Sequence, residues 1–294
     1  MHNYKDQASG LRELASAQPV KVIAVTAGKG GVGKTNITVN LGILLAKTKR
    51  VVLLDGDLGL ANVDVLLGIS SKRNISHVLR GECELQDIMI DAPGGLKIIP
   101  ASSGKENMLN LDLTAHHGLI AAFGELTNGI DILLIDTAAG IADNVSTYLQ
   151  ASQEIIVVVC DEPTSLTDAY ALIKVMNKQF GCWRFRVIAN MVADMKEGRD
   201  LYTKLTQVTD QFLDVTLDYL GAIPYDDSIR QAVKQQNAVV QAYPASKASR
   251  ELKKISEKIL QWPVDISKDG ETGFFMERLL RFKSSNNNAL PMNQ

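Results

Sequence analysis

One octapeptide constrains this chain more than any other feature of its 294 residues. The apolar run Val20–Thr26 leads into Gly28-Lys29-Gly30-Gly31-Val32-Gly33-Lys34-Thr35, and the helical pattern of Lys34–Ala46 follows. This order of strand, glycine-rich loop and helix matches the G-x-x-x-x-G-K-[ST] phosphate-binding loop. Glycines let successive backbone N–H groups turn toward phosphate oxygens, and the helix adds the positive end of its dipole. We therefore expect Lys34 to reach the β- and γ-phosphates of a nucleotide, and the Thr35 hydroxyl to bind Mg²⁺.

Short apolar runs recur along the chain and alternate with segments of helical spacing. Runs this short, without polar alternation, are typical of strands buried on both faces of a parallel sheet. The runs are Val20–Thr26, Val51–Asp55, Leu96–Pro100, Ile130–Asp136, Glu154–Cys160, Phe185–Asn190 and Tyr219–Ile223. The helical segments are Lys34–Ala46, Thr114–Leu126, Asp143–Ala151, Ser165–Phe180 and Lys196–Leu213. The alternation predicts an α/β fold: a doubly wound, mostly parallel sheet with helices on both faces and ligands beyond the carboxyl ends of the strands.

The composition argues against several kinds of protein. The net charge of −2 gives no overall field that would draw the chain to nucleic acid. The three cysteines, Cys83, Cys160 and Cys182, form no C-x-x-C pair, which argues against a zinc site, an iron–sulfur cluster or a disulfide framework. The first twenty residues are polar and resemble no secretory signal, and no apolar run approaches the roughly 20 residues that span a bilayer. We therefore expect a cytosolic protein, or one peripheral to a membrane.

Carboxylates follow two of the predicted strands. Asp55 and Asp57 end and follow the run Val51–Asp55, and Asp136 ends the run Ile130–Asp136. Carboxylates at strand ends that face a phosphate-binding loop can hold metal-bound water and orient an attacking water. A strand-end Asp can also be a helix N-cap. Three such residues beside one phosphate-binding loop favour the functional interpretation.

The full octapeptide, with a lysine at position 29, resembles the deviant Walker A motif of the MinD/ParA family of P-loop ATPases. The resemblance covers roughly residues 20–262 and implies ATP or ADP with Mg²⁺ as ligands, slow ATP hydrolysis, and a homodimer that forms with ATP. In that dimer Lys29 would reach the partner's nucleotide, whereas without the resemblance it would be an exposed loop lysine. The resemblance also implies that Asp57 positions the attacking water, so that the catalytic residues would be Lys29, Lys34 and Asp57. Asp55 and Asp136 would hold the Mg²⁺ shell with Thr35.

Other positions match nucleotide contacts of the same family. Glu162 and Asp168, in the segment Asp161–Asp168, would receive the lysine of the other subunit. Asn190, Pro224 and Asp226 match positions that surround adenine, although a strand-end turn and a proline-fixed loop would also explain them. The nucleotide-binding residues implied by the resemblance are Gly28, Lys29, Gly30, Gly31, Val32, Gly33, Lys34, Thr35, Asn36, Glu162, Asp168, Asn190, Pro224 and Asp226.

Within the family, three segments resemble the flagellar number regulators of the FlhG/FleN type: Gly33–Asn36, Leu54–Gly68 and Glu162–Tyr170. Near the N-terminus, a further set resembles the motif with which these regulators stimulate the SRP-type GTPase FlhF: Asp6, Gln7, Ala8, Leu11 and Arg12. The alternative for that motif is an ordinary capped helix with Leu11 and Leu14 packed on the core. The resemblance also implies a flagellar master transcription activator and C-ring proteins as partners.

The C-terminal segment predicts a contact with a membrane. A helical wheel over about 273–283 places Glu277, Arg278 and Arg281 on one face, opposite an apolar face, with Lys283 within the apolar face. The candidate membrane residues are Phe274, which lies off that face, and Phe275, Met276, Leu279, Leu280 and Phe282. Such a helix after a flexible linker is typical of an interfacial anchor on an anionic membrane surface, and two anchors in a dimer bind more strongly than one. A helix packed on its own domain or on a protein partner is the alternative.

These features predict three parts: a partner-binding segment (1–19), a MinD-like ATPase domain (20–262), and a linker with an amphipathic helix and a disordered tail (263–294). By resemblance, the protein would be an ATP-driven switch at the inner face of the cytoplasmic membrane, at the cell pole, that regulates flagellar number and placement. The main alternative is a ParA-type DNA partition ATPase, which needs a basic surface patch; no sequence-specific contact with nucleic acid is expected. The cysteine pattern argues against an iron–sulfur carrier, and the aspartates argue against a non-catalytic scaffold.

Overall fold

The structure is a computed structural model, and it describes residues 20–57, 63–70, 73–100, 122–123 and 129–263. The predicted partner-binding segment and the predicted membrane helix lie outside the described residues. So does most of the helix expected at Thr114–Leu126, of which Ala122 and Phe123 are described; Phe123 is fully buried.

Eight strands form a single sheet in the order β3-β4-β2-β5-β1-β6-β7-β8. The strands are β1 (Lys21–Thr26), β2 (Val51–Gly56), β3 (Ile90–Asp91), β4 (Lys97–Ile99), β5 (Ile132–Thr137), β6 (Glu154–Cys160), β7 (Arg184–Val192) and β8 (Thr216–Pro224). All neighbouring strands are parallel except β3 and β4. The carboxyl ends of the seven strands from β4 to β8 in this order therefore lie along one edge, which we call the carboxyl edge. Their opposite ends form the amino edge.

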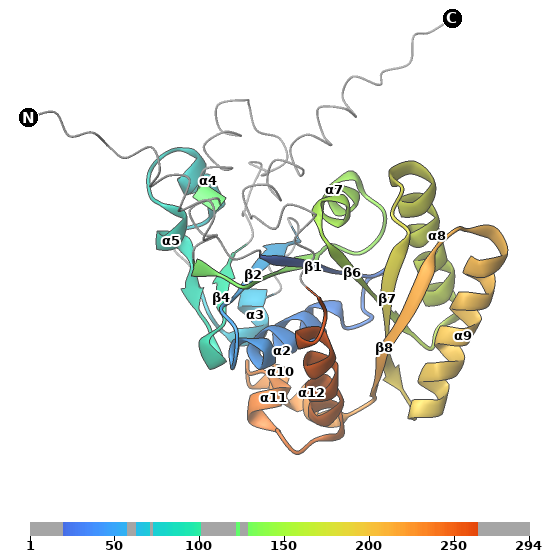
Figure 1. The fold of residues 1–294 in the computed structure, drawn as a ribbon. Coiled ribbons are helices and arrows are strands. Elements are labelled where there is room, and N and C mark those ends of the chain that lie inside the picture. Colours follow the sequence, from blue (N-terminus) through green and yellow to red (C-terminus); the bar gives the residue numbers. More distant parts are fainter. Residues whose placement is uncertain (1–19, 58–62, 71–72, 101–121, 124–128, 264–294) are drawn as a thin grey trace, which may run out of the picture.

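Helices cover both faces of the sheet (Figure 1). One face carries α4 (Ile75–Leu79), α5 (Leu85–Ile88), α7 (Asp143–Ala151), α8 (Pro163–Phe180) and α9 (Met195–Phe212). The other carries α2 (Lys34–Ala46), α3 (Val63–Leu67), α10 (Asp227–Lys234), α11 (Val239–Ala242) and α12 (Lys247–Leu260). A 3₁₀ turn, η1 (Pro93–Gly95), precedes β4. This arrangement confirms the predicted doubly wound α/β fold.

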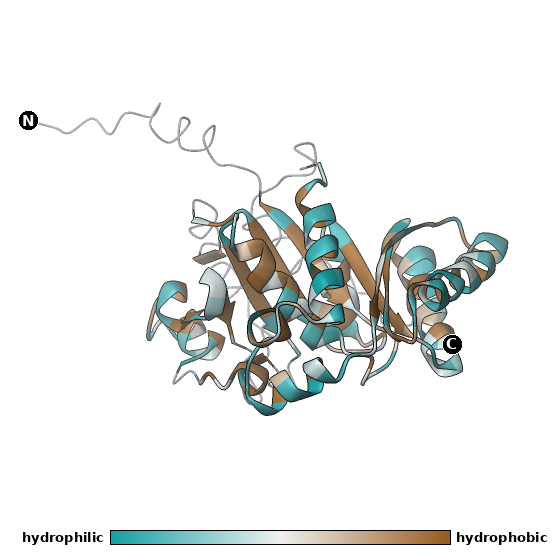
Figure 2. Ribbon diagram, turned by 90° about the horizontal axis from the view of Figure 1, so that it is seen from below, coloured by the Kyte–Doolittle hydropathy of each residue, from teal (hydrophilic) through white to brown (hydrophobic). Residues whose placement is uncertain are grey.

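The core consists of two apolar layers, one on each face of the sheet. In β5, Leu133 and Ile135 pack into one layer, and Ile132 and Leu134 pack into the other. Side chains alternate between the two faces of a strand, so a strand covered on both faces is apolar throughout. Figure 2 shows the result: the central strands are hydrophobic along their length, and the outer surfaces of the helices are largely hydrophilic.

The predicted helices and strands that the structure describes begin and end within a few residues of the observed ones. The observed elements that were not predicted are short or amphipathic. The prediction did not include α3, α4, α5, α10, α11, α12 and the two-residue strand β3. Of these, α12 had a readable signal, because Leu252, Ile255 and Ile259 recur at helical spacing and are buried. Within the described residues, no helix has both the length and the apolar character needed to cross a membrane.

Candidate functional site

The glycine-rich loop joins β1 to α2 at the carboxyl edge, and two glycines make its course possible. Gly33 adopts φ 84° immediately before α2, a left-handed conformation that only glycine adopts readily. Gly28 lies against the backbone of α8, and a Cβ atom there would be 2.2 Å from the carbonyl carbon of Asp168. The start of the loop is also held by the turn after β5, because the Gly140 N–H donates to the Ala27 carbonyl at 2.9 Å.

Lys34 and Thr35 meet Asp136 at the carboxyl end of β5. Lys34 Nζ lies 2.8 Å from Asp136 Oδ1, and Thr35 Oγ1 donates to Asp136 Oδ2 at 2.7 Å. Thr38, one turn along α2, donates to Asp136 Oδ1 at 3.0 Å. Asp136 is fully buried and Lys34 is 7% exposed. The sequence therefore brings the lysine and the hydroxyl expected to hold phosphate and metal onto a single buried carboxylate.

Asp55 lies beside this cluster. It is the penultimate residue of β2 and lies directly opposite Asp136 in the β2–β5 register, where parallel strands are about 4.8 Å apart. Burial, and then the negative charge of Asp136, raise the pKa of Asp55 to about 7. The Asp57 N–H donates to Asp55 Oδ1 at 3.1 Å, so the backbone of Asp57 is fixed while its half-buried side chain lies at the edge.

These groups fit a magnesium ion. Mg²⁺ prefers oxygen ligands, and it usually keeps several waters and binds protein through one or two carboxylates together with phosphate. The residues that could hold it are Thr35, Asp55 and Asp136. Two buried carboxylates in register repel each other, and a divalent cation would relieve that repulsion. No group of three or more His, Cys, Asp or Glu residues suited to a metal occurs among the described residues.

Lys29 lies on the exposed side of the loop and contacts the start of α8. Its ammonium group forms an ion pair with Glu162 of the same chain, and it donates to Thr164 Oγ1 at 3.0 Å. The hydrogen bond to Glu162 raises the pKa of Lys29. Asp168, one turn further along α8, has its backbone against Gly28. The structure thus brings together Lys29 and Glu162, which the sequence analysis assigned to opposite subunits, within a single chain.

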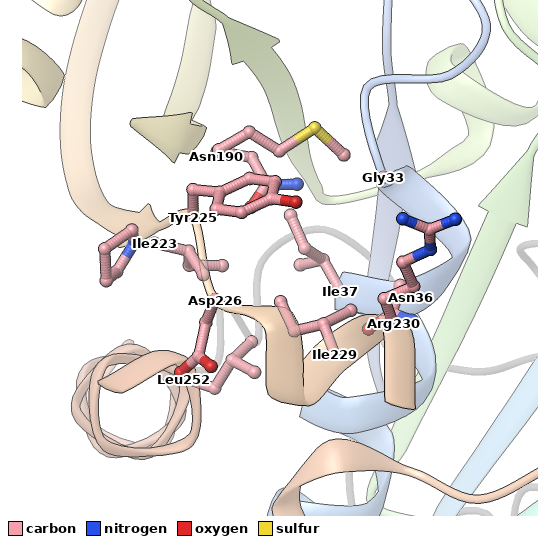
Figure 3. Close-up of a pocket in the computed structure, with 12 residues that line it drawn as sticks. Gly33, Asn36, Ile37, Asn190, Ile223, Tyr225, Asp226, Ile229, Arg230 and Leu252 are labelled. Carbon is pink, nitrogen blue, oxygen red and sulfur yellow. The ribbon is translucent and has the colours of Figure 1, made fainter. Parts of the chain in front are cut away.

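A pocket of about 160 Å³ opens next to the loop, between β7, β8, α2 and α10 (Figure 3). Its apolar walls include Ile37, Ile229 and Leu252. Asn190 supplies a polar group: its Nδ2 donates to the Val32 carbonyl at 2.8 Å, while its buried Oδ1 has no hydrogen-bond partner among the described residues. A largely apolar pocket beside such an acceptor can accommodate a nucleobase that carries an amino group.

Pro224 and Asp226 also line this pocket. Asp226 begins α10 and accepts hydrogen bonds from the N–H groups of Ser228, at 2.9 Å, and Ala248, at 3.0 Å. Burial opposes ionisation of Asp226, but these hydrogen bonds outweigh it and lower its pKa. Both of its carboxylate oxygens therefore already serve the protein's own backbone.

The sequence analysis missed two side chains at the mouth of the pocket. Met191 occupies a bulge between β7 and β8 with φ 56°, and Tyr225 is 62% exposed. Figure 3 shows the ring of Tyr225 facing Ile37 across the pocket. No local sequence signal identifies such residues, because their placement depends on a strand irregularity and on the turn after Pro224. The predicted membrane and N-terminal partner residues, by contrast, lie outside the described residues.

Comparisons with known proteins agree with this geometry. The ParA family model, described as NUBPL iron-transfer P-loop NTPase, matches residues 18–260. The antiactivator FleN of Pseudomonas aeruginosa is 53% identical over 272 residues, which cover 92% of this chain and 97% of FleN. The flagellum site-determining protein YlxH of Helicobacter pylori is 36% identical, over 89% of this chain and 90% of YlxH.

Among solved structures, the septum site-determining protein MinD of Pyrococcus horikoshii, complexed with Mg-ADP, superposes with a TM-score of 0.64 at 25% identity. The match covers 82% of this chain and 96% of MinD. The chain therefore belongs to the ParA/MinD family of P-loop NTPases.

Proposed function

We propose that this protein is an ATPase that acts as a switch: it binds ATP with Mg²⁺, dimerises, hydrolyses the ATP slowly, and regulates the number and placement of flagella. The observation that carries the proposal is the convergence of Lys34, Thr35 and Asp55 on the buried Asp136 at the end of a phosphate-binding loop. The similarity to FleN and YlxH over nearly the whole chain supports the flagellar assignment.

In this proposal each residue of the site has a separate role in binding or hydrolysing the nucleotide. Lys34 leaves Asp136 for the β- and γ-phosphates, where its charge offsets the charge that develops during transfer. Thr35, Asp55 and Asp136 would hold Mg²⁺, which would neutralise phosphate charge when bound. Asp57 orients the attacking water. Asn190 Oδ1 accepts a hydrogen bond from the base amino group, which favours adenine because guanine presents a carbonyl at that position.

Dimerisation would exchange one partner of Lys29 for another. In the single chain Lys29 is held by its own Glu162 and Thr164 at an exposed site, where an ion pair contributes little. A triphosphate presented by a second copy would offer Lys29 a stronger partner. Several of the exposed large apolar side chains lie at this carboxyl edge, which supports a contact there: Val65, Ile141, Met191, Met195 and Tyr225.

Membrane association and partner binding complete the proposal. The amphipathic segment at about 273–283 would bind an anionic membrane weakly alone and more strongly in the dimer. Residues 1–19 would engage a GTPase of the FlhF type, and a flagellar transcription activator and C-ring proteins are further proposed partners. The relative from Pseudomonas aeruginosa is named an antiactivator, which supports the transcriptional partner.

The test compares oligomeric state and vesicle flotation with ADP and with a non-hydrolysable ATP analogue, with and without residues 271–294. We expect the full chain and the chain without residues 271–294 to dimerise with the ATP analogue. Only the full chain should float with the vesicles. Asp57→Ala should bind ATP, dimerise and float while losing hydrolysis. If that variant binds ATP yet stays monomeric, or if the wild type pairs equally well with ADP, the proposed switch is wrong.

A further inference from the structure

We propose that the amino edge of the sheet is the surface that this protein turns toward an anionic lipid bilayer. The inference rests on the membrane association proposed above, and it adds the part of the folded domain that would touch the lipid. Three independent features of this edge support it: the point at which the chain leaves the domain, the charges without partners, and the exposed aromatic side chains.

The described chain leaves the domain at this edge. Trp262 follows α12, and its ring stacks on Arg186 at 4.0 Å from the guanidinium carbon to the ring centroid. Lys21 Nζ donates to the Trp262 carbonyl at 2.6 Å. Lys21 begins β1 and Arg186 lies near the start of β7, so both contacts hold Trp262 at the amino edge. Residues 264–294, which include the predicted amphipathic segment, therefore start from here.

Basic side chains without ionic partners lie along the same edge. Three of its carboxylates are already engaged, in the ion pairs Arg50–Asp131, Arg184–Asp218, Arg186–Asp218 and Arg186–Glu154. Lys47 and Lys49, just before β2, are exposed and form no ion pair within the described part of the chain. Lys178, in the last turn of α8, is also exposed, while the exposed Asp214 before β8 and Asp210, in the last turn of α9, offset two of these three charges. In the last turn of α12, the exposed Glu257 and Lys258 offset each other. The charge left for a partner is therefore positive, which fits an anionic surface.

The edge also carries exposed aromatic side chains. Trp183, just before β7, is 56% exposed, and Phe212, at the end of α9, is 57% exposed. The Thr216 N–H donates to the Trp183 carbonyl at 2.7 Å, which holds the starts of β7 and β8 together. Tryptophan is favoured at membrane interfaces because its ring is apolar and its N–H can remain hydrated. Nucleic acid would use the lysines, but its backbone offers no apolar layer for Trp183 and Phe212, so lipid is the better fit.

The lysines before β2 and Trp183 before β7 are close enough to contact the same bilayer. Between β2 and β7 the sheet has β5, β1 and β6, so the edge spans about 20 Å at the usual strand spacing. A bilayer is continuous over that distance, and each lysine near it adds to the attraction independently. The amphipathic segment is joined to the domain at this edge, so both would bind the same membrane. Binding of one would then raise the effective concentration of the other at the lipid surface.

The first test is flotation of the full chain, with a non-hydrolysable ATP analogue, on phosphatidylcholine vesicles with and without phosphatidylglycerol. Lys47→Gln with Lys49→Gln should weaken binding to the anionic vesicles by about fivefold per lysine. The matched control is Lys247→Gln with Lys253→Gln, which removes two exposed charges from α12. The control should float like the wild type, and both variants should keep the melting temperature.

The second test uses the intrinsic fluorescence of the chain, which has two tryptophans. Brominated lipids in the vesicle should quench Trp183, so quenching should fall in Trp183→Tyr while binding is largely retained. Trp183→Ala should lose binding as well, because it removes the aromatic ring.

The outcomes separate this inference from the function on which it rests. If the wild type does not float with the ATP analogue, membrane association is wrong and the inference is wrong with it. If the wild type floats while the double lysine variant and Trp183→Ala float equally well, the tail alone binds lipid and the amino edge does not. Unchanged flotation with lost binding to duplex DNA in the lysine variant would assign the edge to nucleic acid and overturn the lipid proposal.

Discussion

The two edges of the sheet differ in how completely their buried polar groups are paired. At the carboxyl edge, Asp55 is buried in register with Asp136, and Asn190 keeps an acceptor that has no hydrogen-bond partner in the described part of the chain. At the amino edge, Arg186 binds Glu154 through two hydrogen bonds, at 2.9 and 3.1 Å, and stacks on Trp262. Buried polar groups are costly when unsatisfied. The carboxyl edge thus keeps a buried acceptor that a bound ligand could satisfy. At the amino edge the buried Arg186 is paired within the protein, and its contacts hold the end of the domain.

The largest expected effect lies at the carboxyl edge. Lys34→Ala should lower ATP turnover by about two to three orders of magnitude, because a buried cation that offsets phosphate charge is lost. Lys49→Ala, at the amino edge, removes an exposed lysine and should leave turnover in solution unchanged. Steady-state phosphate release measures both. Equal losses in the two variants would remove the functional distinction between the edges.

A smaller effect is expected from the close packing of the loop. Gly28→Ala should lower the free energy of unfolding by about 2 to 3 kcal/mol, because the new Cβ would be 2.2 Å from the Asp168 carbonyl carbon. Gly30→Ala is the matched control, since no atom lies within 4 Å of the corresponding position. Chemical denaturation without nucleotide compares the two. A stable Gly28→Ala variant would contradict the packing of the loop against α8.

The two edges should also respond to pH with opposite sign. The pKa of Asp55 is raised to about 7 by burial and by Asp136, so between about pH 4 and 7 the folded protein binds more protons than the unfolded chain. Its contribution to the unfolding free energy therefore falls as pH rises, by at most about 1.4 kcal/mol per pH unit. Asp55→Asn should flatten this dependence in unfolding curves measured from pH 5 to 8.

Asp131, at the amino edge, supplies the opposite case. The hydrogen bond from Arg50 lowers its pKa, so its contribution is present at neutral pH and is lost as pH falls through the lowered value. Asp131→Asn should therefore leave the pH 5 to 8 profile unchanged and alter only the acid limb. If Asp131→Asn flattened the pH dependence of the unfolding free energy between pH 5 and 8, Asp55 would not be the source of that dependence.

The smallest effects distinguish a buried ion pair from an exposed one at the same edge. Arg186→Ala should cost about 1 to 2 kcal/mol of unfolding free energy, because Arg186 is 7% exposed and its loss leaves Glu154 without its partner. Arg184→Ala breaks an exposed pair with Asp218 and should cost less than about 0.5 kcal/mol. Both should retain ATP turnover below their melting temperatures. A loss of turnover in Arg186→Ala would mean that the two edges are coupled.

The sequence predicted those parts of the molecule that follow from local patterns. The apolar run Val51–Asp55 corresponds to β2, and the loop Gly28–Thr35 lies between β1 and α2 as expected. Asp55 and Asp136 could be placed at one edge because parallel strands end together. Their exact register, and hence the raised pKa of Asp55, required the structure, because strand order is set by packing between distant segments.

Contacts between distant segments account for what the sequence did not reveal. Arg186 and Trp262 are far apart in the chain, and neither has a neighbour that signals their stacking. The bulge that turns Met191 toward the pocket arises from the pairing of β7 with β8. The cis contact of Lys29 with Glu162 also depends on tertiary structure, since α8 brings Glu162 beside the loop.

The side chain of Asn190 spans two compartments that are usually considered separately. Its nitrogen holds the carbonyl of Val32 in the phosphate loop, and its oxygen, beside the proposed base pocket, has no hydrogen-bond partner among the described residues. In the proposed function, a substitution of Asn190 that changes which base is accepted would also remove the hydrogen bond that holds the loop around the phosphates. Base selectivity and phosphate affinity could then not evolve independently at this position, and a variant with a changed base preference would need a second substitution to restore the loop.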